Sequence, residues 1–218
     1  FFLGIFLGKF FGVHHRITFL LSAGAAICGA TAIAAVAPII KAKPQEVLIS
    51  ITIIFLLNAL AIILFPIVGN ILNMNNYQFG AWSALSIHDT SSVMGAALSY
   101  SDESAQVAAT LKLGRTLWII PLLLISAWFF NSESKKINFP KFIFFFLLAI
   151  LMNTFLDFDD NLILTLKNIS QYLLLIGLFC IGTQSNISDL KQLNIRPIIL
   201  ATCLWLVVIP LSYIIIMY

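Results

Sequence analysis

Ser86-Ile87-His88-Asp89-Thr90 is a polar interruption between two short apolar runs, 77–85 and 91–99. Each run has about nine residues, and at about 1.5 Å per residue a helix of that length reaches only halfway through a hydrocarbon core of roughly 30 Å. The pentapeptide is therefore predicted to lie near the middle of a membrane. Ionisable side chains at that depth cost several kcal/mol unless they face protein or water. Its histidine and aspartate are thus the first candidates for a functional site.

The composition of the whole chain indicates a membrane protein. Of its 218 residues, 61% are hydrophobic and 10% are charged, and the mean hydropathy is +1.02. A soluble domain has about 25% charged residues, so we expect an all-α, polytopic membrane protein instead. The net charge of +3 comes from short basic clusters between apolar segments, a distribution that does not indicate nucleic-acid binding.

Hydropathy divides the chain into spanning segments and polar links. Because the chain starts at Phe1 inside an apolar run, we expect further helices upstream, and we expect residues 1–218 to form one transmembrane domain. Segments long enough to span are expected at 47–72, 105–130, 139–155, 162–183 and 195–217, and residues 1–11 are expected to end another span.

The charged links indicate how the two interrupted segments, 17–40 and 77–100, enter the membrane. If both cross fully, Lys41 and Lys43 fall on the outer side, against the positive-inside rule. If both are re-entrant, every basic link falls on one side. We therefore predict two re-entrant helical hairpins, at about 17–41 and 77–100, whose tips approach each other near the bilayer centre. The basic links hold Lys9/Arg16, Lys41/Lys43, Lys135/Lys136/Lys141 and Lys191/Arg196, and the opposite links are 73–76, Asp102/Glu103 and Asp157/Asp159/Asp160.

An offset of 60 residues relates the two hairpins, since it places Ile27 on Ile87. At this offset each hairpin is followed by a spanning segment, which predicts an internal repeat of about 17–72 and 77–132. With one crossing between them, the two copies enter from opposite faces. Such inverted repeats place a transport site where their broken helices meet at the midplane.

Four stretches together resemble the YeiH-type conserved membrane proteins, a sulfate exporter family. They are Ile27-Cys28-Gly29-Ala30-Thr31-Ala32, Pro38-Ile39-Ile40-Lys41-Ala42-Lys43, Ser86-Ile87-His88-Asp89-Thr90 and Lys112-Leu113-Gly114-Arg115. The resemblance covers essentially the whole chain, and family members are longer at the N-terminus. It implies a multi-pass transporter of the bacterial inner membrane with internal repeats, distantly related to cation/proton antiporter and anion-transporter folds.

His88 and Asp89 are predicted to belong to a coupling or substrate site, with Ser86 and Thr90 beside them. Histidine titrates near neutral pH and a carboxylate neighbour can tune it, which suits a proton-coupled carrier. Two other interpretations stay open. Asp89 or Thr90 could cap the half-helix that begins near Ser91, and His88 could be a hydrogen-bonded buried histidine.

Cys28, Gly29 and Thr31 are candidates at the tip of the first hairpin. Small residues there are typical of close packing between helix backbones. The half-helix that begins near Thr31 would also present N–H groups and a positive dipole end to an anion. Because His88 and Asp89 occupy the positions of Cys28 and Gly29 in the other copy, the ionisable groups occur where the repeat is asymmetric.

Lys112 and Arg115 are three positions apart and therefore share a helix face. In a span that begins near Val107 they lie roughly 7 and 12 Å from its start, where unpaired charge is costly. Lys112 could snorkel to the surface, whereas Arg115 has farther to reach. We predict that this face looks toward His88 and that Arg115 supplies the cationic side of an anion site, through a planar fork suited to sulfate or sulfonate oxygens.

The remaining polar residues give less information about function. His14 and His15 are expected at a membrane interface, and three histidines without Cys/His spacing indicate neither a metal site nor another cofactor. The three cysteines are odd in number and lie in apolar runs, so they are interpreted as small buried hydrophobic residues. Asn58, inside a span, could hold one helix to another.

The sequence thus predicts secondary transport of a small anion, such as sulfate or a related sulfur oxyanion or sulfonate, coupled to a proton or sodium gradient. A passive anion channel would share the basic residues and the broken helices. An intramembrane enzyme could use His88 and Asp89, but no nucleophile constellation or paired-metal signature supports one. The expected partners are the bilayer, the anion and H⁺ or Na⁺; the oligomeric state stays open, with a homodimer as one option.

Overall fold

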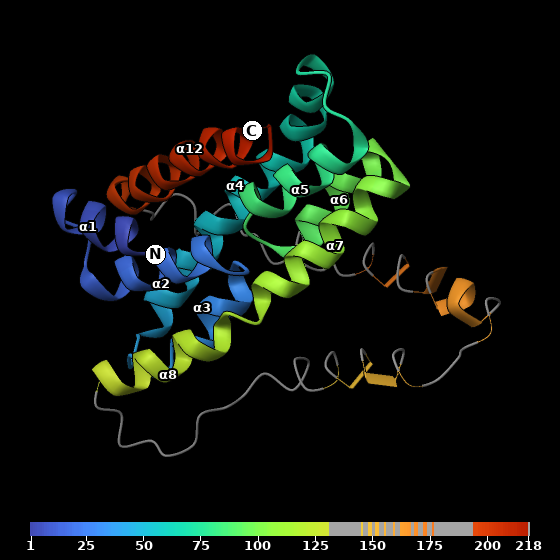
Figure 1. Ribbon diagram of the computed structural model, residues 1–218. Helices are drawn as coiled ribbons and strands as arrows, with labels where there is room; N and C mark the ends of the chain where they lie inside the picture. The colour runs from blue at the N-terminus through green and yellow to red at the C-terminus, as the bar shows by residue number, and fades with distance from the viewer. Residues whose placement is uncertain are drawn as a thin grey trace.

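The computed structural model describes residues 1–130 and 194–217, together with scattered positions between 145 and 176. Every element in this part of the chain is a helix (Figure 1). The predicted spans at 139–155 and 162–183 lie largely outside the described residues. The helices are α1 (Phe2–Phe10), α2 (His15–Ala26), α3 (Ala30–Val36), α4 (Pro44–Ile71), α5 (Asn76–Ser86), α6 (Thr90–Tyr100), α7 (Asp102–Thr116), α8 (Ile119–Phe129) and α12 (Ile195–Met217).

Three stretches of described helix are long and apolar enough to cross a membrane, namely α4, the run from α7 to α8, and α12. They match the spans predicted at 47–72, 105–130 and 195–217. The second is not a single regular helix, because α7 ends at Thr116 and α8 begins at Ile119. Pro121 explains this break, since proline has no N–H to donate to Leu117 and its ring crowds the same carbonyl.

The first interrupted segment is a re-entrant hairpin formed by α2 and α3. His14 Nδ1 lies 3.1 Å from Glu46 Oε1, and Arg16 Nη1 lies 3.8 Å from Glu46 Oε2. Glu46 is in the first turn of α4, the helix that follows α3. The start and the end of this hairpin therefore lie at the same end of α4. At its tip Gly29 has a φ of +62°, a conformation that glycine adopts without the strain a Cβ would bring.

The second interrupted segment, formed by α5 and α6, is also re-entrant. The Tyr100 hydroxyl at the end of α6 donates to the Met74 carbonyl, just before α5. The Tyr100 ring also stacks on Phe79 of α5, with centroids 3.9 Å apart. Met74 follows α4, so this hairpin opens at the opposite end of α4 from the first, and the prediction of two re-entrant hairpins is confirmed. The internal inverted repeat of 17–72 and 77–132 stays a prediction.

Charges separate between the two ends of the molecule as the positive-inside rule requires. The basic end holds Arg16 and Lys43, and the Arg196 guanidinium is next to Gly12 there. At the other end Asn76 Nδ2 donates to Glu103 Oε2 at 2.8 Å. The positive-inside rule predicts that this basic end faces the cytoplasm.

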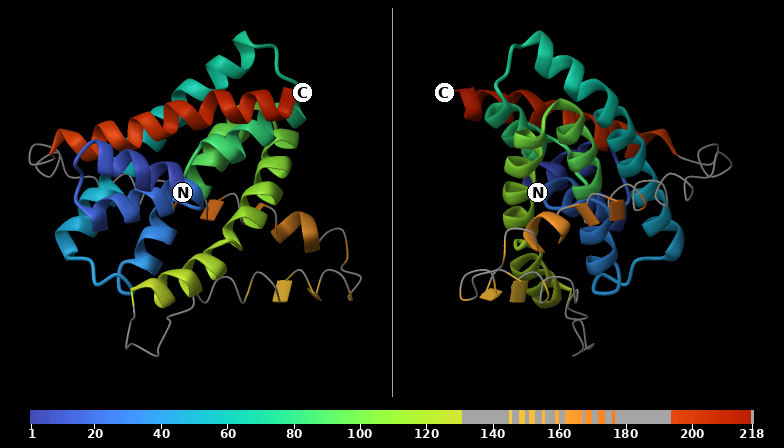
Figure 2. Two further views of the ribbon diagram at one scale, coloured as in Figure 1. Left: turned by 60° about the vertical axis from the view of Figure 1, so that its left-hand side comes forward. Right: turned by 90° about the vertical axis from the view of Figure 1, so that its right-hand side faces the viewer.

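The C-terminal helix α12 lies across α2, α4 and α5, as the views of Figure 2 show. An aromatic stack in the core joins three helices. The ring centroid of Phe65 in α4 lies 4.3 Å from that of Trp82 in α5 and 6.1 Å from that of Trp205 in α12. Trp82 Nε1 also donates to the Ile209 carbonyl at 3.2 Å. These contacts fix the second hairpin against α12 and α4.

Candidate functional site

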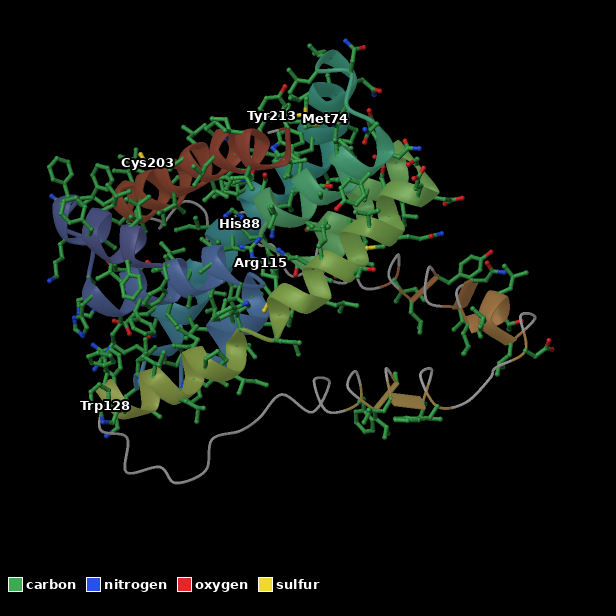
Figure 3. All side chains as sticks on the ribbon, viewed as in Figure 1. Met74, His88, Arg115, Trp128, Cys203 and Tyr213 are labelled. Atoms are coloured by element: carbon green, nitrogen blue, oxygen red, sulfur yellow. The ribbon has the colours of Figure 1, made fainter. Side chains whose placement is uncertain are left out.

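The tips of the two hairpins meet beside the middle of α4. A Cβ placed on Gly29 would lie 3.3 Å from Asp89 Cβ and 3.3 Å from Ile54 Cγ2. Asn58, one turn after Ile54, contacts His88. Both α4 residues lie near the centre of this 28-residue helix. The predicted approach of the two tips to each other is therefore confirmed, beside the middle of a helix long enough to span a membrane, and Figure 3 shows His88 and Arg115 in this central region.

His88 is buried, with 3% of its surface exposed, and it contacts a single side-chain oxygen. Its backbone N–H donates to Asn58 Oδ1 at 3.3 Å, and its Nδ1 lies 3.3 Å from the same oxygen. A backbone N–H can only donate, so this hydrogen-bond network assigns the facing Asn58 atom as the carbonyl oxygen. Nδ1 then carries a proton, and in the neutral imidazole Nε2 is left to accept one.

Asp89 caps the second half-helix, as one of the two interpretations from the sequence expects. Its Oδ2 accepts from Ser92 N at 3.1 Å and from Ser92 Oγ at 3.2 Å. The side chain is buried, and Oδ1 has no donor within the described part of the chain. Thr90 is the first residue of α6 and is partly buried. Capping therefore uses one carboxylate oxygen and leaves the other for chemistry at the tip.

Lys112 is fully buried and points at the end of α5. Its Nζ donates to the Ile87 carbonyl at 2.6 Å and lies 3.5 Å from the Ala84 carbonyl. Lys112 therefore does not snorkel to the membrane surface. The last carbonyls of a helix have no intrahelical donor and carry partial negative charge, so the ammonium group stabilises the end of α5 next to His88.

Arg115 joins the ends of two half-helices through four hydrogen bonds. Its Nε donates to Ala26 O at 2.9 Å and its Nη2 donates to Ala25 O at 2.6 Å, both at the end of α2. Its Nη1 donates to Ala84 O at 3.1 Å and to Leu85 O at 2.8 Å, both at the end of α5. The face carrying Arg115 does look toward the His88 hairpin, but the guanidinium fork that was expected to bind an anion directly faces backbone carbonyls here.

Charge at the tips is unevenly balanced. Two cationic side chains, Lys112 and Arg115, and one carboxylate, that of Asp89, lie at the helix ends that meet here. The cations are at the C-terminal ends of α2 and α5, whereas Asp89 is at the N-terminal end of α6. Each charge therefore opposes the partial charge of its helix end. The arrangement lets four helix ends and three charged groups lie together in the interior.

The remaining predicted residues differ in how they contribute. Ser86 Oγ lies 2.6 Å from Ser212 Oγ of α12, and the Ser86 carbonyl accepts from Trp205 Nε1 at 3.1 Å. Ser86 thus ties the tip to α12. Cys28 is buried at the first tip with a free thiol, and Thr31 is partly buried in the first turn of α3.

Sequence reasoning did not assign three residues that contact the tips. Asn58 was predicted only to hold helices together, whereas Trp205 and Ser212 lie in a span that looked uniformly apolar. A polar residue near the middle of a span was the available signal for Asn58, and a serine within an otherwise apolar stretch was the signal for Ser212. Within the part of the chain that the structure describes, no group of three His, Cys, Asp or Glu side chains could hold a metal ion.

Comparison with known proteins places this chain among bacterial membrane proteins. A family model described as conserved hypothetical protein 698 matches residues 1–201. A UPF0324 membrane protein of Bacteroides thetaiotaomicron is 42% identical over 208 residues, covering 94% of this chain and 63% of the relative. Another from Shewanella oneidensis is 43% identical over 189 residues, covering 87% and 60%. The chain thus spans about three fifths of the length of these relatives, and no solved structure matches it.

Proposed function

We propose that this chain, which belongs to the bacterial membrane protein family described as conserved hypothetical protein 698, is a secondary transporter of a small anion. The observation that carries the proposal is the meeting of two re-entrant tips, with His88 and Asp89, beside the middle of a spanning helix. Non-helical backbone and ionisable groups at that depth are typical of a substrate or ion pathway. The expected location is the bacterial inner membrane.

The charge balance favours an anion as the substrate. Lys112 and Arg115 outnumber the single carboxylate of Asp89, and the first turn of α6 presents backbone N–H groups at the tip. Arg115 contributes its charge while it holds α2 and α5 together. Oxygen-rich anions such as sulfate, sulfite or a sulfonate match this set of donors, because each offers several acceptors to a site made mostly of N–H groups.

Coupling to a proton gradient fits the pair formed by His88 and Asp89. The imidazole can take up a proton at Nε2, and Asp89 Oδ1 can do the same, because neither atom is used by the hydrogen bonds that hold the tip. A proton bound at the tip would offset part of the charge of a bound anion. Sodium coupling is the other option, with the Asp89 carboxylate as its ligand.

A proteoliposome assay separates this carrier from a passive anion channel, the second candidate. Purified protein is reconstituted, and uptake of labelled sulfate, sulfite and a sulfonate is measured under an imposed proton or sodium gradient. A carrier gives saturable uptake against the anion gradient and exchange with unlabelled anion on the other side. Purely dissipative, non-saturable flux would identify a channel, and no flux of any anion on the panel would refute the proposal.

A further inference from the structure

The side-chain amide of Asn58 is buried, and its oxygen takes part in hydrogen bonds while its nitrogen does not. Its side chain is 2% exposed, and its Oδ1 faces both the backbone N–H and the Nδ1 of His88. Its Nδ2 makes no hydrogen bond. Among the side-chain nitrogen and oxygen atoms of the described residues that are themselves fully enclosed, this is the one atom without a partner. Buried donors in folded proteins are normally paired, so this exception calls for a physical explanation.

Rotating the amide by 180° does not remove the unpaired donor. The rotated side chain would present its NH₂ group to the backbone N–H of His88, and two donors would then face each other. The carbonyls of Ala84, Leu85 and Ile87 at the end of α5 already accept from Lys112 and Arg115. The unpaired Nδ2 is therefore a consequence of how the tip is built.

Other N–H donors at the same tip also lack acceptors. His88 is two residues before Thr90, where α6 begins. The first N–H groups of a helix have no acceptor within the helix, and Asp89 satisfies that of Ser92. The N–H groups of Thr90 and Ser91 are left at the same tip as Asn58. A helix start and an unpaired buried amide thus offer donors at the same tip, near the middle of α4.

We propose that Asn58 is a substrate-binding residue whose Nδ2 donates a hydrogen bond to an oxygen of the transported anion. The inference rests on the proposed function and specifies the ligand as an oxyanion. A cation beside Nδ2 would meet an N–H donor instead of an oxygen ligand, because the one side-chain oxygen of Asn58 faces His88. A bound oxyanion supplies the acceptor that Nδ2 lacks. Asn58 therefore contributes to selection of anion over cation at the tip.

The central test replaces the donor and keeps the rest of the side chain. In Asn58→Asp, an oxygen still faces His88, but the second atom becomes an acceptor that repels an oxyanion. Sulfate binding to the purified protein, measured by isothermal titration calorimetry at fixed ionic strength, should weaken by at least about tenfold. Asn70→Asp makes the same chemical change at an exposed position of the same helix and should bind sulfate within about twofold of wild type.

Two further measurements keep the test decisive if Asn58→Asp does not fold. Asn58→Leu removes the donor without adding charge and should also lose sulfate binding. In wild-type protein labelled with ¹⁵N-asparagine, the Asn58 side-chain resonance should shift when sulfate is added and stay unchanged with sodium gluconate at equal ionic strength. The signal that disappears in Asn58→Gln identifies the Asn58 resonance. The measurement itself uses wild-type protein, so it does not require Asn58→Asp or Asn58→Leu to fold.

The outcomes separate this inference from the proposed function. Wild-type sulfate affinity in both folded variants, or an unmoved Asn58 resonance while wild type binds sulfate, would overturn the role of Asn58 and leave the transporter proposal standing. A wild-type protein that binds and transports none of sulfate, sulfite and a sulfonate would refute the proposed function, and the role of Asn58 with it.

Discussion

At the scale of single residues, two side chains supply hydrogen-bond donors to the carbonyls left unpaired where two helices end inside the membrane. The last carbonyls of α2 and α5 have no intrahelical donors, and in hydrocarbon each unpaired group would cost several kcal/mol. Arg115 supplies donors to two carbonyls of each helix. Lys112 supplies a further donor to the end of α5. These cations therefore stabilise the broken helices before any substrate binds.

Arg115→Lys should destabilise the protein although the charge is kept. An ammonium group is a compact donor that cannot reach the carbonyls of both α2 and α5 as the planar guanidinium does. We expect a loss of about 1–3 kcal/mol in the free energy of unfolding, and a larger loss for Arg115→Gln. Reversible unfolding of the purified protein in mixed micelles with SDS measures this difference.

Arg16→Lys is the matched control for Arg115→Lys. Arg16 is partly exposed and lies 3.8 Å from Glu46 at the membrane surface, where ion pairs contribute little. Its stability should change by less than about 0.5 kcal/mol. Equal effects of the two substitutions would show that the four hydrogen bonds of Arg115 are not what stabilises the tips.

Asp89→Asn separates the capping role of Asp89 from its proposed role in coupling. Asparagine caps helices about as well as aspartate, whereas alanine loses about 1 kcal/mol. Asp89→Asn should therefore keep wild-type stability and lose gradient-driven uptake, and Asp89→Ala should lose both. If Asp89→Asn transports anion as wild type does, the carboxylate serves only to start α6. Uptake in proteoliposomes and unfolding in micelles are measured on the same preparations.

The sequence could predict the candidate residues that are ionisable, because the free-energy cost of a charge inside a membrane depends on its depth. His88 and Asp89 were identified because they interrupt a half-span, and Lys112 and Arg115 because they lie deep in a full span, where a charge is costly. The partners of Arg115 could not be predicted, because they are backbone carbonyls, which every residue has. The unpaired amide of Asn58 was equally hidden, since it depends on a contact with His88 across 30 positions of sequence.

At the scale of elements, the shape of each hairpin depends on its tip. Gly29 has a positive φ, and a Cβ there would lie 3.3 Å from Asp89 Cβ and from Ile54 Cγ2. The first tip therefore needs glycine both for its turn and for its approach to the second tip. Half-span lengths located both breaks in the sequence, because a run of about nine residues cannot cross the bilayer. The break between α7 and α8 was not predicted, although Pro121 lies just beyond it.

Gly29→Ala and Gly114→Ala should change stability in opposite directions. At Gly29 an added Cβ meets a positive φ and two neighbours, so we expect a loss of about 1–3 kcal/mol. Gly114 lies inside α7 with nothing within 4 Å of an added Cβ. Alanine there should stabilise the protein by about 0.5–1 kcal/mol through helix propensity. The same unfolding assay measures both, and a stable Gly29→Ala would contradict the close approach of the tips.

At the scale of the whole molecule, the topology follows from where the basic links lie. The two hairpins open at opposite ends of α4, and the described basic residues of the polar links gather at one of these ends. The positive-inside rule could predict this because it depends only on charge and span length. The place of α12 could not be predicted, since its contacts with α2, α4 and α5 come from packing between distant segments. Its side chains nevertheless hold the second tip through Ser86.

A carrier must expose its site to each side in turn, so some contact around the tips has to change during transport. Arg115 binds the two tips to each other, whereas Ser212 and Trp205 bind the second tip to α12. The hydrogen bonds to α12 are fewer than those that Arg115 makes. We therefore expect the paired hairpins to move as one unit relative to α12.

A reversible disulfide between Ser86→Cys and Ser212→Cys, in a background without native cysteines, tests this movement. The two Oγ atoms are 2.6 Å apart, near the roughly 2.05 Å of an S–S bond. Oxidation should abolish uptake into proteoliposomes, and reduction should restore it. The control pair, Ser101→Cys and Ser104→Cys, replaces two serines whose Oγ atoms are 2.8 Å apart at the start of α7, away from α12, so its oxidised form should remain active. Full uptake by the oxidised Ser86–Ser212 pair would show that α12 and the hairpins move together, and the moving contact would then have to be sought elsewhere in the molecule.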